Sequence, residues 1–264
     1  MKNIIQTLRT NSPFLYGCII FILLLAVISV AGLILDERTL KGVNVWIKPL
    51  KFNISTAIYM STVGFLITFY PYSRLKTRLI NGVVAWTLLI EMIIINLQAA
   101  RGVHSHYNVS NPFDGILFGM MGILIGVNVI IMLLLFMDAI RLRLKLELML
   151  QIAIVLGWIV VIGGSWVGGQ MIGQMAHNVG VPDGGQGIPL LNWSTIAGDL
   201  RVAHFFGLHG IQVIPLFALW VSNSWNVKKL AKFMAVVIFG LLYASWIAFT
   251  FYQAKQGLPL IALS

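Results

Sequence analysis

One acidic residue interrupts a long apolar stretch. Glu91 lies within 83–97, where an ionised side chain costs about 2.5 to 3.5 kcal/mol if lipid surrounds it. The carboxyl group must therefore face protein, water or a ligand, and it can take up a proton or a cation. On a helix Thr87 lies one turn before Glu91, and Gln98 lies two turns after it, followed by Arg101. A neutral Glu91, hydrogen-bonded between helices, is the alternative reading.

Histidines form the second group of residues that could carry chemistry. Imidazole is a common ligand of zinc, copper and haem iron. A haem or a transition metal is one interpretation of this group, and hydrogen-bonded anchoring is the alternative. His204 and His209 are five residues apart, about 140° around a helix, so they need not share one ion. The candidate metal ligands are His104, His106, His177, His204 and His209.

Two further helical segments carry polar side chains inward. Lys51, Ser55, Tyr59 and Thr62 recur at helical spacing, which predicts a polar stripe that faces the Glu91 stripe. The other segment holds His204, His209 and Gln212, followed by Pro215. Because proline lacks an N–H, Pro215 leaves a backbone carbonyl beside Gln212 without its donor and predicts a kink.

These residues converge on one predicted cavity. At 1.5 Å per helical residue, Glu91 lies about 15 Å below Arg101, and His209 lies about 15 Å below Asp199. Equal depth makes a contact between Glu91 and His209 geometrically reasonable. The predicted ligand-binding residues are Lys51, Ser55, Tyr59, Glu91, Gln98, Arg101, His204, His209 and Gln212.

The composition indicates that the helices that position these residues are surrounded by lipid. Of the 264 residues, 59% are hydrophobic and only 10% are charged, whereas soluble domains have about 25% charged residues. One core of this size cannot hide so much apolar surface, so lipid must cover much of it. The net charge of +10 fits the positive-inside rule, and we expect the lipid bilayer rather than nucleic acid as the partner.

The sequence predicts an all-α fold, a polytopic bundle of seven transmembrane spans within one domain, residues 1–264. Basic residues gather after the second, fourth and sixth spans, which places the N-terminus inside and the C-terminus outside. The polar site then lies toward the non-cytoplasmic side. The predicted spans are 13–35, 50–70, 79–98, 115–140, 148–168, 200–222 and 233–254, and the fifth could continue to about Met175.

Small residues mark two of these spans. Glycines at 115, 119, 122 and 126 share one face of the fourth span. The fifth span carries a similar set of small residues, Gly164, Ser165, Gly168, Gly169 and Gly173. Such faces favour close helix packing, within the chain or in a homo-oligomer. Asp114, just before the first set, is expected to cap its helix.

Three segments carry a family resemblance. The run from Asp183 through Gly198, Asp199 and Arg201 to His209 and Gln212, together with 98–106 (QAARGVHSH) and 48–55, resembles a pattern of bacterial multi-pass integral membrane proteins of uncharacterised function. The resemblance implies a shared site among these segments, and an inner (cytoplasmic) membrane if the chain is bacterial. It brings no activity or cofactor.

The leading hypothesis is an integral membrane protein whose outward-facing, histidine-containing cavity binds a small ligand, with a metal or haem cofactor ranked first. Proton-coupled transport of a small solute, with Glu91 as the proton carrier, is the second hypothesis. A membrane-embedded metal-dependent hydrolase is the third. Whether the chain is an enzyme stays open at this point.

Overall fold

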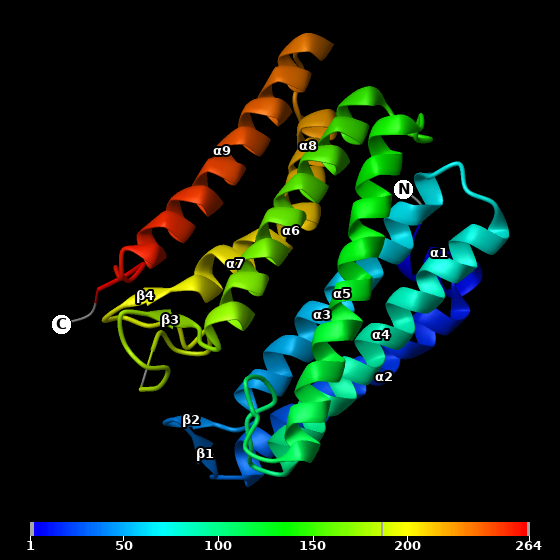
Figure 1. Cartoon of the computed structure of the whole chain (residues 1–264). Helices are drawn as coiled ribbons and strands as arrows, with labels where there is room; N and C mark the ends of the chain where they lie inside the picture. Colours follow the sequence, from blue (N-terminus) through cyan, green and yellow to red (C-terminus); the bar gives the residue numbers. More distant parts are fainter. Residues whose placement is uncertain (1–2, 186, 263–264) are drawn as a thin grey trace. The chain divides into compact units, whose positions relative to one another are not determined.

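The computed structural model describes residues 3–185 and 187–262. These fall into two compact units, Met1–Ile131 and Met132–Ser264, which are described separately below. The secondary structure is almost entirely helical, as expected from the sequence (Figure 1). In the described residues, six helices are long and apolar enough to cross a membrane, and a bent helix pair can provide a seventh span. The protein is therefore a polytopic membrane protein, while its orientation stays a prediction.

Unit 1 consists of helices that run in alternating directions, joined by the connections 36–46, 70–73 and 101–111 (Figure 1). A short helix precedes the first long one, and α3 ends in a 3-10 turn. The long helix α5 begins in this unit and continues into the second. The elements are α1 (Ile4–Asn11), α2 (Pro13–Leu35), β1 (Thr39–Leu40), β2 (Val43–Asn44), α3 (Ile47–Leu66), η1 (Ile67–Phe69), α4 (Arg74–Ala100) and α5 (Pro112–Arg141).

A buried polar cluster joins α2, α3 and α4 in the core of unit 1. Asn53 and Asn96 exchange two amide hydrogen bonds of 3.2 and 3.1 Å across α3 and α4. Ser29 of α2 donates to Asn96 Oδ1 at 3.3 Å and accepts from Asn53 Nδ2 at the same distance. All three side chains are buried. Because lipid cannot replace a lost partner, these bonds help fix how the three helices pack.

The connection between α2 and α3 is a small antiparallel hairpin, in which Thr39 pairs with Asn44. Trp46 follows the hairpin and lies over Gly32, where a Cβ atom would collide with the indole ring. The indole Nε1 donates to Asp36 at 2.8 Å. Hydrogen bonds from Arg38 and Trp46 hold the pKa of Asp36 well below its usual range. Trp46 is therefore a packed and hydrogen-bonded part of unit 1 as well as an aromatic residue near a span end.

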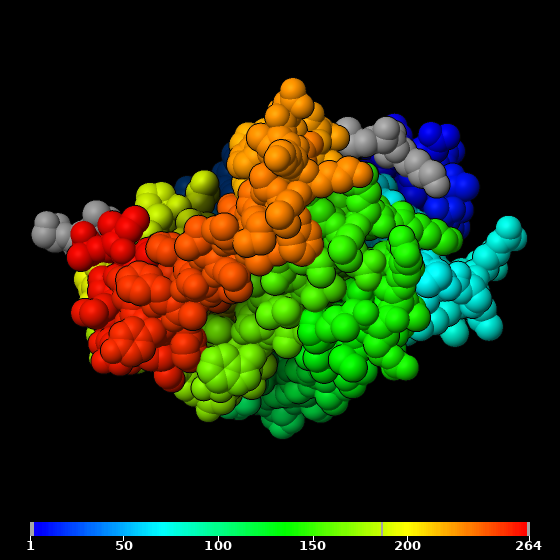
Figure 2. All heavy atoms as spheres, turned by 90° about the horizontal axis from the view of Figure 1, so that it is seen from above, coloured from blue at the N-terminus to red at the C-terminus, as the bar shows by residue number. Residues whose placement is uncertain are grey.

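Unit 2 packs α7 and α8 between α6 and α9. Its elements are α6 (Leu148–Gln174), β3 (Asn178–Val179), β4 (Gly198–Asp199), α7 (Leu200–Leu208), α8 (Gly210–Ser224) and α9 (Lys229–Lys255). The fifth predicted span continues to Gln174, as the sequence indicated. Strands β3 and β4 pair antiparallel and close the long connection between α6 and α7. Figure 2 shows α9 lying open along one face, in orange to red, and its exposed side chains include Leu241, Leu242 and Phe249.

The sixth predicted span is broken at His209, before the position of Pro215 at which the sequence predicted a kink. Helices α7 and α8 are bent by 48°. His209 lies between them with φ −87° and ψ 0°, and it is both the C-cap of α7 and the N-cap of α8. Pro215 instead lies inside α8, whose other backbone hydrogen bonds continue past it. Gly207 and Gly210 flank the break, and their small size allows the close packing that fixes the bend there.

Glycines explain how closely α6 and α7 approach. A Cβ atom on Gly164 would lie 2.7 Å from the backbone of Gly207, so neither position has room for a side chain. This confirms helix packing as the role of Gly164, whereas a Cβ atom on Gly169 or Gly173 would meet nothing within 4 Å among the described residues. A Cβ atom on any of the four α5 glycines would likewise meet nothing within 4 Å among the described residues. Their packing role, including a homo-oligomer, stays a prediction.

Candidate functional site: a buried carboxyl group in unit 1

Glu91 is buried within a long helix, as expected from the sequence. Its exposed fraction is 4%, and it lies near the middle of the 27-residue helix α4. Its Oε2 atom has no hydrogen-bond partner among the residues that the structure describes. A buried, unpaired polar group costs about 1 to 3 kcal/mol, and more when it is charged. Such a group calls for a proton, a water molecule or a ligand.

Thr87 and Gln98, on the same face of α4, both bond to α5. Thr87 accepts a hydrogen bond from Asn128, and Gln98 donates to Asp114 Oδ1 at 2.8 Å. Because Glu91 lies between them on one helical stripe, it belongs to the face of α4 that turns toward α5. The stripe was predicted from the sequence, but its partners on α5 were not.

The end of this stripe is a closed ionic cluster. Arg101 bonds to Gln98 and forms an ion pair of 2.5 Å with Asp114, whose exposed fraction is 1%. Asn111 donates to Asp114 Oδ2 at 2.7 Å and accepts from the Asp114 backbone N–H at 3.0 Å. Asn111 is therefore the cap of α5, and the capping role expected of Asp114 is wrong. Gln98 and Arg101, predicted as ligand-binding residues, are occupied with Asp114.

The α3 stripe lies half-buried on a different face from the one that bonds to α4. Helix α3 reaches α4 through Asn53 and Thr56, whose hydroxyl lies 3.3 Å from Met92 Sδ. Lys51, Ser55, Tyr59 and Thr62 each keep intermediate exposure. The buried Tyr59 hydroxyl has no partner in the described part of the chain. That this stripe faces Glu91 stays a prediction.

The His-x-His pair lies in the connection between α4 and α5. His106 contacts Ser105 Oγ through Nδ1 at 3.1 Å, and its ring packs beside Phe52 and Phe118. The carbonyl of His104 accepts from Asn108 Nδ2 at 3.1 Å. These contacts anchor the connection, which was the alternative to metal ligation.

In unit 2, the ring of His204 packs against two glycines of α6. Its Nδ1 lies 2.8 Å from the carbonyl oxygen of Gly164, and a Cβ atom on Gly168 would touch the ring at 2.8 Å. The carbonyl can only accept, so Nδ1 carries the proton and Nε2 is left as the lone-pair nitrogen when the ring is neutral. His209 lies at the helix break with its ring centroid 4.6 Å from that of Phe205. Its predicted partner Glu91 belongs to the other unit, so that contact stays a prediction.

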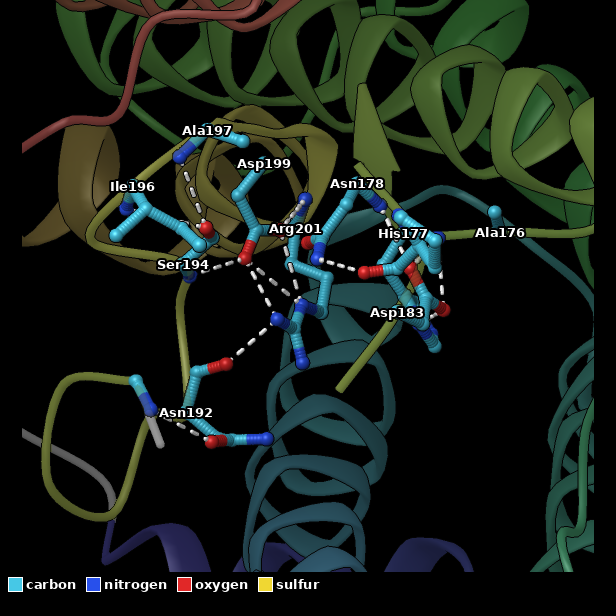
Figure 3. A network of polar contacts seen from close by, with 12 residues as sticks. Ala176, His177, Asn178, Asp183, Asn192, Ser194, Ile196, Ala197, Asp199 and Arg201 are labelled. Atoms are coloured by element: carbon cyan, nitrogen blue, oxygen red, sulfur yellow. Dashed lines mark hydrogen bonds and ion pairs between the residues drawn. The ribbon is translucent and has the colours of Figure 1, made fainter. Parts of the chain in front are cut away.

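Two aspartates organise the long connection of unit 2 (Figure 3). Asp183 accepts from the backbone N–H groups of His177 and Asn178 and forms a 2.5 Å pair with His177 Nδ1. Asp199 accepts from the Ser194 backbone at 2.8 Å and pairs with Arg201 at 2.6 Å. Burial tends to raise the pKa of Asp183, but the bonds from His177 and Asn178 outweigh it and hold the pKa below its usual range. From the sequence, Asp183 was identified only as part of the family resemblance.

Metal-ligand geometry is the remaining test of the histidine hypothesis. Within residues 3–185 and 187–262, no group of three or more His, Cys, Asp or Glu side chains is placed to hold a metal ion. His177 is engaged with Asp183, and His104 and His106 lie in the other unit. A haem needs only one or two protein ligands, so a group of three is not required for haem binding.

Comparison with known proteins adds no functional assignment to this geometry. No protein-family model, no curated protein and no solved structure matches the chain.

Proposed function

We propose that this membrane protein takes up and releases a proton at Glu91 and couples that exchange to the movement of a small solute. The observation that carries the proposal is the Oε2 atom of a carboxyl group that is 4% exposed and has no described hydrogen-bond partner. Ionisable residues within membrane spans are costly, and they often mark ion and proton pathways.

Energetics favour exchange over a fixed structural role. A structural carboxylate is expected to have its oxygens hydrogen-bonded, as those of Asp114 are. Glu91 lacks this support, so the ionised form is poorly stabilised and the neutral form is favoured. A solute or cation that offers charge or donors to Oε2 reverses the preference, and this is the energetic basis for coupling.

The test is solute-driven proton entry into proteoliposomes that contain a trapped pH-sensitive dye. Sugars, amino acids and carboxylates are added singly under an inward proton gradient. We expect at least one class to accelerate acidification in the native protein and to have no effect in Glu91→Gln. Glu37→Gln, at an exposed position, is the matched control and retains the response. Acidification that survives Glu91→Gln, or the absence of any response in the native protein, contradicts the proposal.

A carbodiimide provides a second, direct readout. A protonated carboxyl group adds its O–H across a C=N bond of a hydrophobic carbodiimide to give an O-acylisourea. Migration of the acyl group from O to N gives a stable N-acylurea, which peptide mass spectrometry can locate. A Glu91 that is neutral at neutral pH is labelled, whereas the water-exposed Glu37 is not. Labelling of both residues, or of neither, counts against a neutral Glu91.

A second candidate function is cofactor binding at His204, which retains the histidine hypothesis. Metal-ligating histidines usually donate one ring N–H to a carbonyl or carboxylate group, as His204 Nδ1 does to Gly164. Nε2 would then be the ligating atom for a haem iron or a transition metal. Purified protein is expected to carry haem absorbance or stoichiometric metal that His204→Gln loses. The absence of both from the native protein excludes this candidate.

A further inference from the structure

We propose that Glu91 and Asn128, with Thr87 between them, form a binding site for a dehydrated monovalent metal cation such as Na⁺ at the middle of α4 and α5. The inference rests on the proposed function, since it assigns a second ligand to Glu91. All three residues belong to unit 1.

The orientation of the Asn128 amide is fixed by its neighbours. Asn128 Nδ2 donates to the carbonyl oxygen of Leu124 at 3.2 Å and also to Thr87 Oγ1. A carbonyl oxygen can only accept, so a reversed amide would place two oxygens in contact. The buried atom without a partner among the described residues is therefore Oδ1, an acceptor.

The hydrogen-bond inventory of the cluster leaves acceptors and no spare donor. The Thr87 hydroxyl donates to the carbonyl of Val83 at 2.8 Å, and the Asn128 amide nitrogen makes the two bonds given above. Among the described residues, Asn128 Oδ1 and Glu91 Oε2 stay unpaired, and both side chains are at least nine-tenths buried. A ligand for these oxygens must supply positive charge or hydrogen, which excludes an anion.

The two unpaired oxygens belong to neighbouring side chains. Residues four apart on a helix have Cβ atoms about 5 to 6 Å apart, so Glu91 lies directly beside Thr87. Asn128 is hydrogen-bonded to Thr87, so its amide lies at the same level. Both helices are near their midpoints here, at the depth where transporters place coupling ions.

Charge selects the class of cation. Glu91 is the one carboxylate among these three residues, and the charge of the Lys48 ammonium group, at the start of α3, already acts on it. A divalent ion would therefore bury a larger excess of positive charge among apolar helices than a monovalent ion. Carboxylate, amide and hydroxyl oxygens are hard ligands that suit alkali and alkaline-earth ions rather than copper or zinc. The site therefore fits a monovalent alkali ion, in competition with the proton of Glu91.

A second buried asparagine provides an internal contrast. Asn81 donates to Ser12 Oγ, and its buried Oδ1 also lacks a partner in the part of the chain described. However, Asn81 lines a pocket with the cationic residue Arg78 and with no acid. Without a carboxylate to balance the charge of Arg78, that site is unsuitable for a cation, so Asn81 is the matched control.

The test is thermal unfolding of the full-length, detergent-solubilised protein at alkaline pH, with Na⁺, Li⁺, K⁺ or choline chloride at equal ionic strength. Binding to the folded state raises Tm in a saturable manner. We expect Na⁺ or Li⁺ to do so relative to choline. Glu91→Gln abolishes the shift, and Asn128→Leu weakens the apparent cation affinity roughly tenfold or more, as for a lost polar contact. Asn81→Leu keeps the native response.

Asn128→Asp tests the charge argument and serves if Asn128→Leu does not fold. Adding a second carboxylate should shift the preference toward Ca²⁺. Equal Tm in Na⁺ and choline for the native protein overturns the cation site, as does an unchanged cation response in Asn128→Leu or an unchanged preference in Asn128→Asp.

The two proposals fail separately. Cation-specific stabilisation without solute-driven acidification leaves the cation site standing and removes proton coupling. Acidification that needs Glu91, together with no difference between Na⁺ and choline, leaves the proposed function standing and removes the cation site.

Discussion

Two buried acids along the same helix interface of unit 1 have opposite surroundings. Asp114 is 1% exposed and accepts side-chain bonds from Gln98, Arg101 and Asn111. Glu91 is 4% exposed, and its Oε2 accepts none from the described residues. Burial alone therefore does not identify a functional acid. The distinction lies in whether the surrounding protein has already supplied the hydrogen bonds.

Position along the helix accounts for this difference. Asp114 lies in the first turn of α5, next to a connection that carries cations and amides, and Arg101 keeps 35% of its side chain exposed. Part of the charge pair thus remains in contact with polar surroundings. Glu91 lies mid-helix, where its neighbours in sequence are apolar and only other helices can provide partners.

The largest effect is expected from opening the Asp114 cluster. Arg101→Leu leaves a buried carboxylate without its counter-ion and should lower the free energy of unfolding by about 3 kcal/mol. Asp114→Asn should cost less, about 1 to 2 kcal/mol, because the partly exposed Arg101 can turn to water. Denaturant unfolding in mixed micelles measures both variants. Equal losses would indicate that the pair does not depend on the burial of Asp114.

Replacing Glu91 should change the free energy of unfolding in the opposite direction. Replacing a buried, unsatisfied acid with a well-packed apolar residue is often stabilising, so Glu91→Leu should raise the free energy of unfolding by about 2 kcal/mol in cation-free buffer. The same assay applies, with Glu37→Gln as the exposed control. A loss comparable to that of Arg101→Leu would place Glu91 with Asp114 among the structural acids.

The sequence was most informative about angles around single helices. Apolar run length located the spans, and helical spacing placed Thr87, Glu91 and Gln98 on one stripe. Both inferences depend on local geometry, which the backbone of a helix enforces. The bounds of α2, Pro13–Leu35, agree with the predicted span.

Partners across helices could not be obtained in this way. Periodicity indicates on which face of its helix Asn128 lies, but not which other helix packs against that face. The hydrogen bond from Asn128 to Thr87 was therefore missed. Asp114 was assigned to a local cap because the nearest explanation in sequence was local, whereas its main partner Arg101 is 13 residues away. A signal did exist for Ser29, Asn53 and Asn96, since each is a polar residue inside an apolar span.

The buried amides allow the same comparison without charge. Asn53 and Asn96 satisfy each other, whereas Asn128 Oδ1 is unpaired in the described chain. Asn53→Leu should lower the free energy of unfolding by about 1.5 kcal/mol, because it removes both amide bonds to the buried Asn96, which keeps only its bonds to Ser29 and to the Met92 carbonyl. The double variant with Asn96→Leu should lose less than the sum of the singles. A double-mutant cycle measures this coupling, and strict additivity would show that the pair contributes little.

Asp183 extends the comparison to a partnered acid outside the predicted spans and should give the smallest effect. Its pKa in the folded protein lies below the unfolded value of about 3.9, so the unfolded state binds more protons as the pH falls. The stabilisation is complete above about pH 4 and is lost as the pH falls through the folded pKa, with an expected magnitude of roughly 1 kcal/mol.

Amide hydrogen exchange at His177 and Asn178, corrected for intrinsic rates, should show protection that declines below about pH 4 in the native protein. In Asp183→Asn that protection should be lower at neutral pH and independent of pH. A native protein whose exchange at these two amides does not change over the acid range would mean that Asp183 does not hold β3 in place, and the contrast with Glu91 would then apply only within unit 1.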